Sequence, residues 1–108
     1  QPEGYWTRSL LDPEHAPGPE TSGTAFFTYG LLWGMNNGFL DKATYQPVVE
    51  KAWKYLTTVA LQPDGRIGYV QPIGEKAIPG QVVDANSTAN FGVGAFLLAA
   101  CEMVRFLD

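Results

Sequence analysis

Polar residues cluster where two long apolar segments begin. They form two groups, Glu20, Thr21 and Ser22 in the first and Asp84, Asn86 and Ser87 in the second. Backbone N–H groups at a helix start carry partial positive charge, so such a place suits hydroxyl and carboxylate groups of a ligand. The same residue types also cap helices, and each cap contributes about 1 kcal/mol. The sequence therefore predicts a polar binding rim, with helix capping as the alternative that the residue types alone favour.

The residue types give little support for a metal site or for other kinds of catalytic site. The chain has one histidine, His15, one cysteine, Cys101, and no carboxylates paired at ligand spacing, so we predict no metal site and no cofactor. A catalytic triad could combine Ser22, His15 and Asp84, but this histidine lies in a proline-rich loop, where an exposed side chain is expected. The Gly-Val-Gly-Ala-Phe run at 92–96 follows no predicted strand and lacks the third glycine of a dinucleotide loop.

Aromatic side chains are a second source of binding surface. Trp33 lies in an apolar run and Trp53 on an apolar helical stripe, so both are predicted to be core residues. Trp6 lies with Tyr5 and Arg8 in the N-terminal loop. We include Trp6 among the candidate binding residues, and a purely structural role for it stays equally open.

Composition narrows the class of protein. The 108 residues are 45% hydrophobic and 17% charged, which favours one small folded unit over a disordered chain. The net charge is −4 and the basic residues are scattered, so we expect no nucleic-acid partner. Two uncharged runs, 21–40 and 85–101, are interrupted by threonine, asparagine and glycine, so we expect buried helices and no membrane partner. Cys101 ends the second run and is predicted to be a buried thiol.

Three helices are predicted, over residues 22–37, 44–60 and 86–107. The first and third are apolar on nearly every face and should be buried on most of them. The second carries one apolar stripe opposite a charged face, which is typical of an outer, half-solvated helix. The predicted fold class is therefore all-α.

Polar residues should mark the helix starts. Thr21 or Ser22 is predicted to cap the first helix, and Asp84, Asn86 or Ser87 the third. Proline at position 47 is tolerated only in a first helical turn, so the second helix should start near residue 44.

The sequence Gln-Pro-acid-Gly occurs twice, at 1–4 and at 62–65, each time ahead of an apolar helix. Placing Thr24-Ala25 on Thr88-Ala89 also aligns Phe27 with Phe91 and Gly30 with Gly94. The repeat unit would be a turn, a loop, an inner helix and an outer helix, with about one and a half copies in the chain. Parallel inner helices would start at the same end of the molecule. A hairpin repeat cannot bury its inner helix alone, so neighbouring repeats are expected to cover it.

Three segments carry a resemblance to a known family. They are GYWTRSLLDPEHAPGPETSGTAFFTYGLLWGMNNGFLDKATYQPVVEKAW, QPDGRIGYVQPIG and STANFGVGAFLLA. With them the chain resembles the C-terminal part of the unsaturated rhamnogalacturonyl hydrolases, which are grouped with the unsaturated glucuronyl hydrolases in glycoside hydrolase families 88 and 105. Where many relatives have Thr-Glu-Val-Tyr, this chain has Thr88-Ala89-Asn90-Phe91.

The resemblance implies an α/α toroid, a six-hairpin ring, of which residues 1–108 would be a C-terminal fragment within one domain. It also implies a glycoside hydrolase that removes terminal unsaturated galacturonic or glucuronic acid. In the family an aspartate protonates the enol-ether double bond, water adds, and the hemiketal opens to release the next sugar. The resemblance places that aspartate upstream of Gln1, so we assign no catalytic residue.

The Glu-Thr-Ser at 20–22 matches a family motif at the pocket end of an inner helix. The candidate substrate-binding residues are Glu20, Thr21, Ser22, Asp84, Ser87 and Trp6. The implied partner of the full-length enzyme is an unsaturated uronic-acid oligosaccharide. A non-catalytic helical carbohydrate-binding or interaction module on the same scaffold is the alternative.

The chain starts without methionine or a signal peptide, which indicates a piece of a longer polypeptide. Alone, it is expected to be inactive and to form a homo-oligomer through its uncovered apolar faces. The compartment stays open, since bacterial relatives occur in the cytoplasm and in the periplasm.

Overall fold

The computed structural model describes all residues, 1–108, and is built from helices. The elements in chain order are α1 (Thr21–Asn36), α2 (Lys42–Tyr55), the π-helical turn η1 (Leu56–Ala60) and α3 (Asn90–Leu107). The backbone ladder of α2 shifts in register at η1, where Leu61 N donates to Leu56 O at 3.0 Å. No sheet is formed, and the only strand-like pairing is an isolated bridge between Leu61 and Ile67. The all-α prediction is confirmed.

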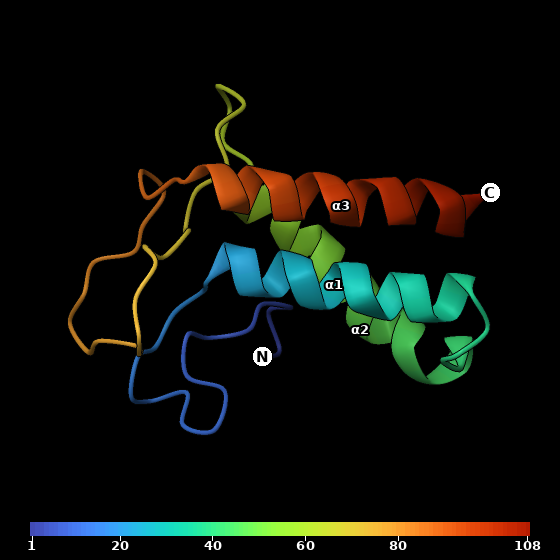
Figure 1. The fold of residues 1–108 in the computed structure, drawn as a ribbon, viewed down its shortest axis with the longest axis horizontal. Coiled ribbons are helices and arrows are strands. Elements are labelled where there is room, and N and C mark those ends of the chain that lie inside the picture. Colours follow the sequence, from blue (N-terminus) through green and yellow to red (C-terminus); the bar gives the residue numbers. More distant parts are fainter.

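The inner helices α1 and α3 lie side by side and run in the same direction, while α2 returns against α1 (Figure 1). Both inner helices start at the end of the molecule where the loops before them gather. This is the arrangement predicted for successive hairpins, in which one hairpin is α1 with α2 and the next begins with α3.

Two clusters of apolar side chains hold the helices together. The first cluster lies beside the end of α2, where alanines let the inner helices approach closely. The members of this cluster are Ala25, Tyr55, Leu56, Ala60, Ile67, Val70, Ala95 and Ala99. The second lies nearer the far ends of the inner helices; its members are Leu32, Met35, Val49 and Met103. Trp53 packs on both clusters while remaining partly exposed, in agreement with its predicted core position.

The two Gln-Pro-acid-Gly segments adopt the same turn. Gly4 N donates to Gln1 O and Gly65 N donates to Gln62 O, each at 2.9 Å. The glycines have φ angles of +96° and +90°, in the left-handed region that L side chains rarely adopt. The repeat in the sequence is therefore a repeat of structure at its turns.

The structure corrects two predictions about where the helices start. Neither Thr21 nor Ser22 caps α1, because the carboxylate of Glu20 folds back and accepts from the N–H groups of Ser22 and Gly23. The second helix begins at Lys42, two residues before the predicted start.

The third helix begins at Asn90, after Ala89, which makes no side-chain cap. The prediction that it starts at residue 86 with Asp84, Asn86 or Ser87 as the cap is therefore wrong. The physical reason is that the backbone of residues 84–87 forms a separate turn, which is hydrogen-bonded to another segment and does not continue into the helix. In that turn Tyr69 N donates to the carbonyl oxygen of Asp84 at 2.8 Å, and Val70 N donates to that of Ser87 at 2.9 Å.

Burial also differs from the prediction. Cys101 is exposed, and Trp33 is 42% exposed and stacks on Phe39. On α3, Leu97 is 56% exposed, so this helix is not buried on most of its faces. A helical hairpin cannot cover its own inner helix, and these faces have no further hairpin against them within residues 1–108.

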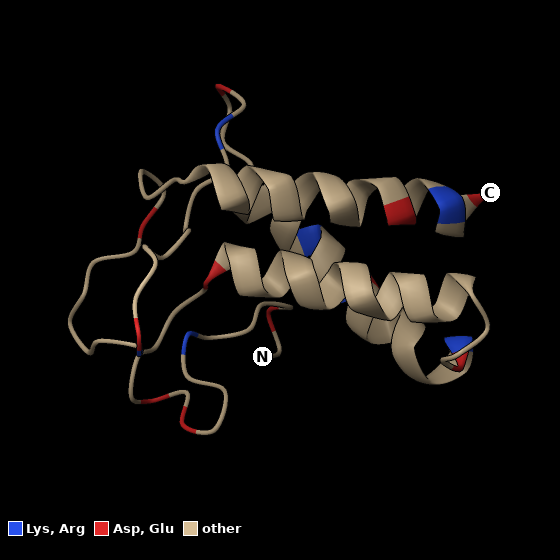
Figure 2. Ribbon diagram, in the orientation of Figure 1, with Lys and Arg blue, Asp and Glu red and all other residues tan.

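Charged residues are scarce on the inner helices, since α1 has none and α3 has only Glu102 and Arg105 (Figure 2). By length and composition alone α3 could cross a membrane, with a mean hydropathy of 1.4. The core helix of a soluble protein passes the same test, so this property assigns no membrane role.

The uncovered face leads to a prediction about association. Phe26, Phe91, Leu97 and Leu98 line a shallow apolar depression between α1 and α3. We expect the 108-residue chain alone to form dimers or larger assemblies, measurable by light scattering across a dilution series. Replacing Leu97 and Leu98 by lysine should shift the chain toward monomer, and the same change at the fully exposed loop residue Leu11 should not. A chain that stays monomeric at every concentration would contradict this expectation.

Candidate functional site

The carboxylate of Glu20 lies at the start of α1 and is 2% exposed. Its Oε1 accepts from the hydroxyl of Ser22 and from Gly23 N, both at 2.7 Å. Its Oε2 accepts from Ser22 N at 3.1 Å and from Gln71 N at 3.0 Å. Both oxygens are thus occupied by donors of the chain itself, which accounts for about all their acceptor capacity. Glu20 joins the start of α1 to the segment that follows residue 70.

Thr21 is also fully buried and engaged. Its hydroxyl donates to the carbonyl oxygen of Gly68 at 2.6 Å and lies 2.7 Å from the hydroxyl of Tyr55. Its backbone N–H donates to the carbonyl oxygen of Tyr69 at 2.8 Å. Thr21 therefore connects α1 to the end of α2 and to the same segment that Glu20 holds.

The segment 67–71 lies between the starts of the two inner helices. Gly68 comes so close to the chain before α3 that an added Cβ would lie 2.5 Å from the carbonyl oxygen of Ala85. Tyr69 has a φ of 62°, an uncommon conformation for a bulky residue, and it is held there by its bonds to Thr21 and Asp84. The segment is thus fixed by hydrogen bonds and contacts on both sides.

A cavity of about 430 Å³ opens beside this segment, at the end where α1 and α3 start. Its polar and aromatic lining residues are Arg8, Ser22, Gln71, Lys76, Gln81 and Phe91. Of the residues proposed from the sequence, Ser22 alone lines this cavity. Arg8, Lys76 and Gln81 were missed, because Arg8 is far from the other two in the sequence and no local pattern joins them.

Trp6 lies outside this cavity. Its ring packs against that of Phe27, with centroids 5.1 Å apart, and its backbone N–H donates to the hydroxyl of Thr24 at 2.9 Å. With Tyr5 and Lys51 it lines a separate, smaller cavity of about 220 Å³. Trp6 and Ser22 therefore line different cavities.

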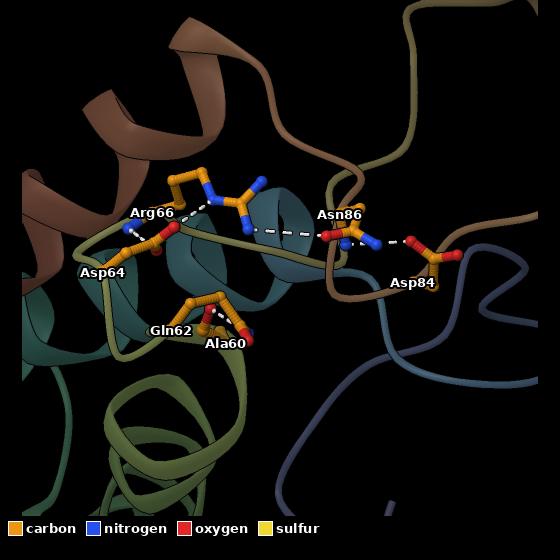
Figure 3. Close-up of polar contacts among 6 residues, drawn as sticks. All are labelled: Ala60, Gln62, Asp64, Arg66, Asp84 and Asn86. Carbon is orange, nitrogen blue, oxygen red and sulfur yellow. Dashed lines mark hydrogen bonds and ion pairs between the residues drawn. The ribbon is translucent and has the colours of Figure 1, made fainter.

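Asp84 and Ser87 form their own turn, of which Figure 3 shows Asp84 and Asn86. Asp84 Oδ1 accepts from Asn86 N at 2.9 Å, and Ser87 Oγ accepts from Asp84 N at 3.0 Å. Arg66 reaches across to Asn86 Oδ1 at 3.4 Å and pairs with Asp64 at 2.7 Å. The backbone N–H and the guanidinium of Arg66 lower the pKa of Asp64. These contacts connect the repeated turn to the chain before α3 and leave Asp84 and Ser87 away from the cavity lining.

The hydroxyl of Tyr55 gives the site a pH-dependent stability. Burial raises the pKa of Tyr55 above its usual value near 10. In the unfolded chain this tyrosine ionises near that value, so stability is fully present below about pH 10 and is lost as the pH rises further. We expect unfolding midpoints to fall steeply above about pH 10, and Tyr55→Phe should flatten this slope. Tyr45→Phe, on the same helix, is the control, and an unchanged slope in Tyr55→Phe would contradict the assignment.

The paired inner helices and their polar ends can be compared with known proteins. A family model described as Glycosyl Hydrolase Family 88 matches residues 1–107. The chain belongs to glycosyl hydrolase family 88. The chain is 47% identical over 103 residues to an unsaturated 3S-rhamnoglycuronyl hydrolase of Formosa agariphila, and 45% identical over 102 residues to one of Alteromonas sp.. These matches cover 95% and 94% of this chain but 26% and 24% of the relatives, so it spans about a quarter of their length.

Solved structures similar to this chain include one that is described as a member of the same family. A glycosyl hydrolase family 88 protein from Bacteroides vulgatus is 78% identical, with a TM-score of 0.92, over 98% of this chain and 30% of the other. A protein described as a polysaccharide lyase is 89% identical with the same TM-score, over 99% of this chain and 30% of the other. A possible family 105 member from Klebsiella pneumoniae shares the fold, with a TM-score of 0.80 at 23% identity, over all of this chain and 28% of the other. The predicted fold class, a portion of an α/α toroid, is confirmed.

Proposed function

We propose that the whole protein containing this chain is a glycoside hydrolase that removes a terminal unsaturated uronic acid from an oligosaccharide. The observation that carries the proposal is the match, over nearly the whole chain, to two unsaturated 3S-rhamnoglycuronyl hydrolases at 47% and 45% identity. A cavity of about 430 Å³ at the shared start of the inner helices is a suitable place for part of such a sugar.

The proposed reaction is hydration of an enol ether. A proton is added to one carbon of the double bond and water adds to the other, which gives a hemiketal. The hemiketal opens to a ketone and leaves a hemiacetal, whose collapse releases the hydroxyl of the next sugar. The proton donor would be the family's aspartate, which the resemblance places upstream of Gln1.

The residues of this chain would position the sugar. Ser22 lines the cavity and its hydroxyl donates to Glu20, while Glu20 and Thr21 hold the helix start and the segment 67–71 in place. We therefore assign Glu20 and Thr21 as positioning residues, which act through Ser22 and the cavity wall rather than by contact with substrate.

The test compares the whole protein with the 108-residue chain on an unsaturated uronic-acid disaccharide, following loss of the ultraviolet absorbance of the double bond. The whole protein should remove the absorbance and the chain alone should not. A whole protein that binds the disaccharide without turnover would favour the carbohydrate-binding module instead. Turnover by the 108-residue chain would contradict the assignment of the acid to the upstream part.

A further inference from the structure

Most of the residues that line the cavity beside Ser22 come from one segment, the cavity loop, which we define as residues 71–83. It contains no helix or strand. Its one internal backbone hydrogen bond runs from Gln81 N to the carbonyl oxygen of Ile78, at 3.2 Å. The shape of the cavity therefore depends on what holds this loop in place.

The two ends of the cavity loop are fixed. Gln71 N donates to Glu20 Oε2 at 3.0 Å, and just outside the loop Tyr69 N donates to the carbonyl oxygen of Asp84 at 2.8 Å. The middle of the loop has little support from apolar packing, because its large apolar side chains are exposed. These are Ile73, Ile78 and Val82, which are 88%, 51% and 75% exposed. The middle is therefore held by polar contacts.

The hydrogen bonds that reach the middle of the cavity loop from elsewhere all come from the N-terminal loop, residues 7–19. Arg8 Nη1 donates to the carbonyl oxygen of Ile78 and to Gln81 Oε1, both at 3.3 Å. His15 Nε2 lies 3.4 Å from the carbonyl oxygen of Ala77, and since a carbonyl oxygen only accepts, the ring nitrogen is the donor. Both loops lie at the end of the molecule where the inner helices start (Figure 1).

The N-terminal loop is a firm support for these contacts. Glu20 N donates to the carbonyl oxygen of Trp6 at 3.1 Å, which closes the loop at its base. His15 N donates to the carbonyl oxygen of Asp12 at 3.0 Å, and the next residue, Ala16, is fully buried. His15 is not among the residues that line the cavity, so its side chain holds the cavity loop from outside the cavity.

We propose that His15 is a positioning residue, which holds the cavity loop in the shape that binds the sugar without touching the sugar itself. Its ring N–H group fixes Ala77, which lines the cavity, and Arg8 fixes the next residue, Ile78. The proposal rests on the proposed function and adds a determinant of substrate binding that lies outside the cavity. A loop with fixed ends and an exposed middle opens locally at low cost in free energy, so the loss of one hydrogen bond should be measurable.

Trypsin measures how often the cavity loop opens, because Lys76 is the only lysine or arginine in it. In the whole protein, His15→Phe keeps a ring but removes the donor, and it should raise the rate of cleavage after Lys76 about threefold. His15→Gln restores an N–H donor and should return this rate to that of the wild type. Glu14→Ala, at the neighbouring exposed position, is the matched control and should leave the rate unchanged. Mass spectrometry identifies the cut.

Kinetics on an unsaturated uronic-acid disaccharide test whether the hold on the loop matters for the sugar. His15→Phe should raise KM about threefold and change kcat by less than about twofold, because a displaced loop weakens binding of the ground state and the transition state alike. His15→Gln should recover the KM of the wild type.

The cleavage measurement separates this proposal from the proposed function. Unchanged cleavage in His15→Phe, or equal acceleration in Glu14→Ala, would overturn the proposal. Faster cleavage with an unchanged KM in an active protein would also overturn the positioning role. If the whole protein turns over no disaccharide, the proposed function fails alone, and faster cleavage that His15→Gln reverses would still support the hold of His15 on the cavity loop.

Discussion

Replacing Glu20 by glutamine is expected to destabilise the protein by about 3 kcal/mol. The carboxylate accepts four hydrogen bonds, two on each oxygen, from Ser22, Gly23 and Gln71. An amide has one oxygen, so its NH₂ group must face two of these donors, and at least two buried N–H or O–H groups lose their acceptor. The urea midpoint of the whole protein measures the loss.

Two variants serve as comparisons for Glu20→Gln. Glu14→Gln changes an exposed loop carboxylate and should leave the midpoint unchanged. Ser22→Ala removes one of the four donors and should cost about 1 kcal/mol, well below the effect at Glu20. If Glu20→Gln proved as stable as the wild type but raised KM strongly, Glu20 would contact substrate and the positioning role would be wrong.

The repeated turns give a matched pair of glycine substitutions with very different expected effects. Gly4 and Gly65 share a left-handed φ, so alanine at either position should cost about 1–2 kcal/mol from the backbone alone. At Gly65 nothing lies within 4 Å of an added Cβ. At Gly4 the Cβ would meet the backbone of α2, 2.5 Å from the carbonyl carbon of Lys51 and in closer contact with its oxygen. We expect Gly4→Ala to cost more than about 4 kcal/mol.

Thermal unfolding of the whole protein with each substitution measures this difference. Gly65→Ala should lower Tm modestly, and Gly4→Ala should lower it by several times as much or prevent folding. Lys51→Ala tests whether side-chain contacts explain the effect, and it should change Tm little because Gly4 meets the backbone of Lys51. Equal losses at Gly4 and Gly65 would show that the first turn does not pack on α2.

The sequence predicted the features that depend on local chemistry. The Gln-Pro-acid-Gly segments are turns because proline and a left-handed glycine favour that geometry wherever they occur. The helices α1 and α2 lie within a few residues of the predicted ranges, since their periodic patterns and the Asn37-Gly38 end are local signals.

Features set by distant contacts were not predictable in this way. Asp84 and Ser87 have the residue types of helix caps, but the segment 68–70 takes up their carbonyl oxygens and α3 starts later. Glu20 was proposed as a substrate contact from the Glu-Thr-Ser motif at the helix start, and its partner Gln71 N, 51 residues further along the chain, is not visible in that local pattern. The cavity lining brings Arg8 to Gln81, 73 residues further along the chain, and no spacing rule detects such a pair.

The exposure of Trp33 and Cys101 has a different origin. Both were expected in the core because their neighbours in the sequence are apolar, and that inference assumes a complete set of packing partners. A chain that spans about a quarter of its relatives provides those partners on one side only.

The hydrogen bond between Glu20, at the start of α1, and Gln71 has a consequence for synthesis on the ribosome. Within residues 1–108, α1 is translated before α2 and α3, but Gln71, whose N–H group completes the hydrogen bonds to Glu20, follows that residue by 51 positions. At the other end, Asn36 donates to Glu102, 66 residues later. Contacts of such long sequence separation form late. The start of the nascent α1 therefore lacks its long-range contact until Gln71 has emerged, and its other end lacks its own until α3 has emerged. During that interval the apolar surface of α1 is exposed to aggregation.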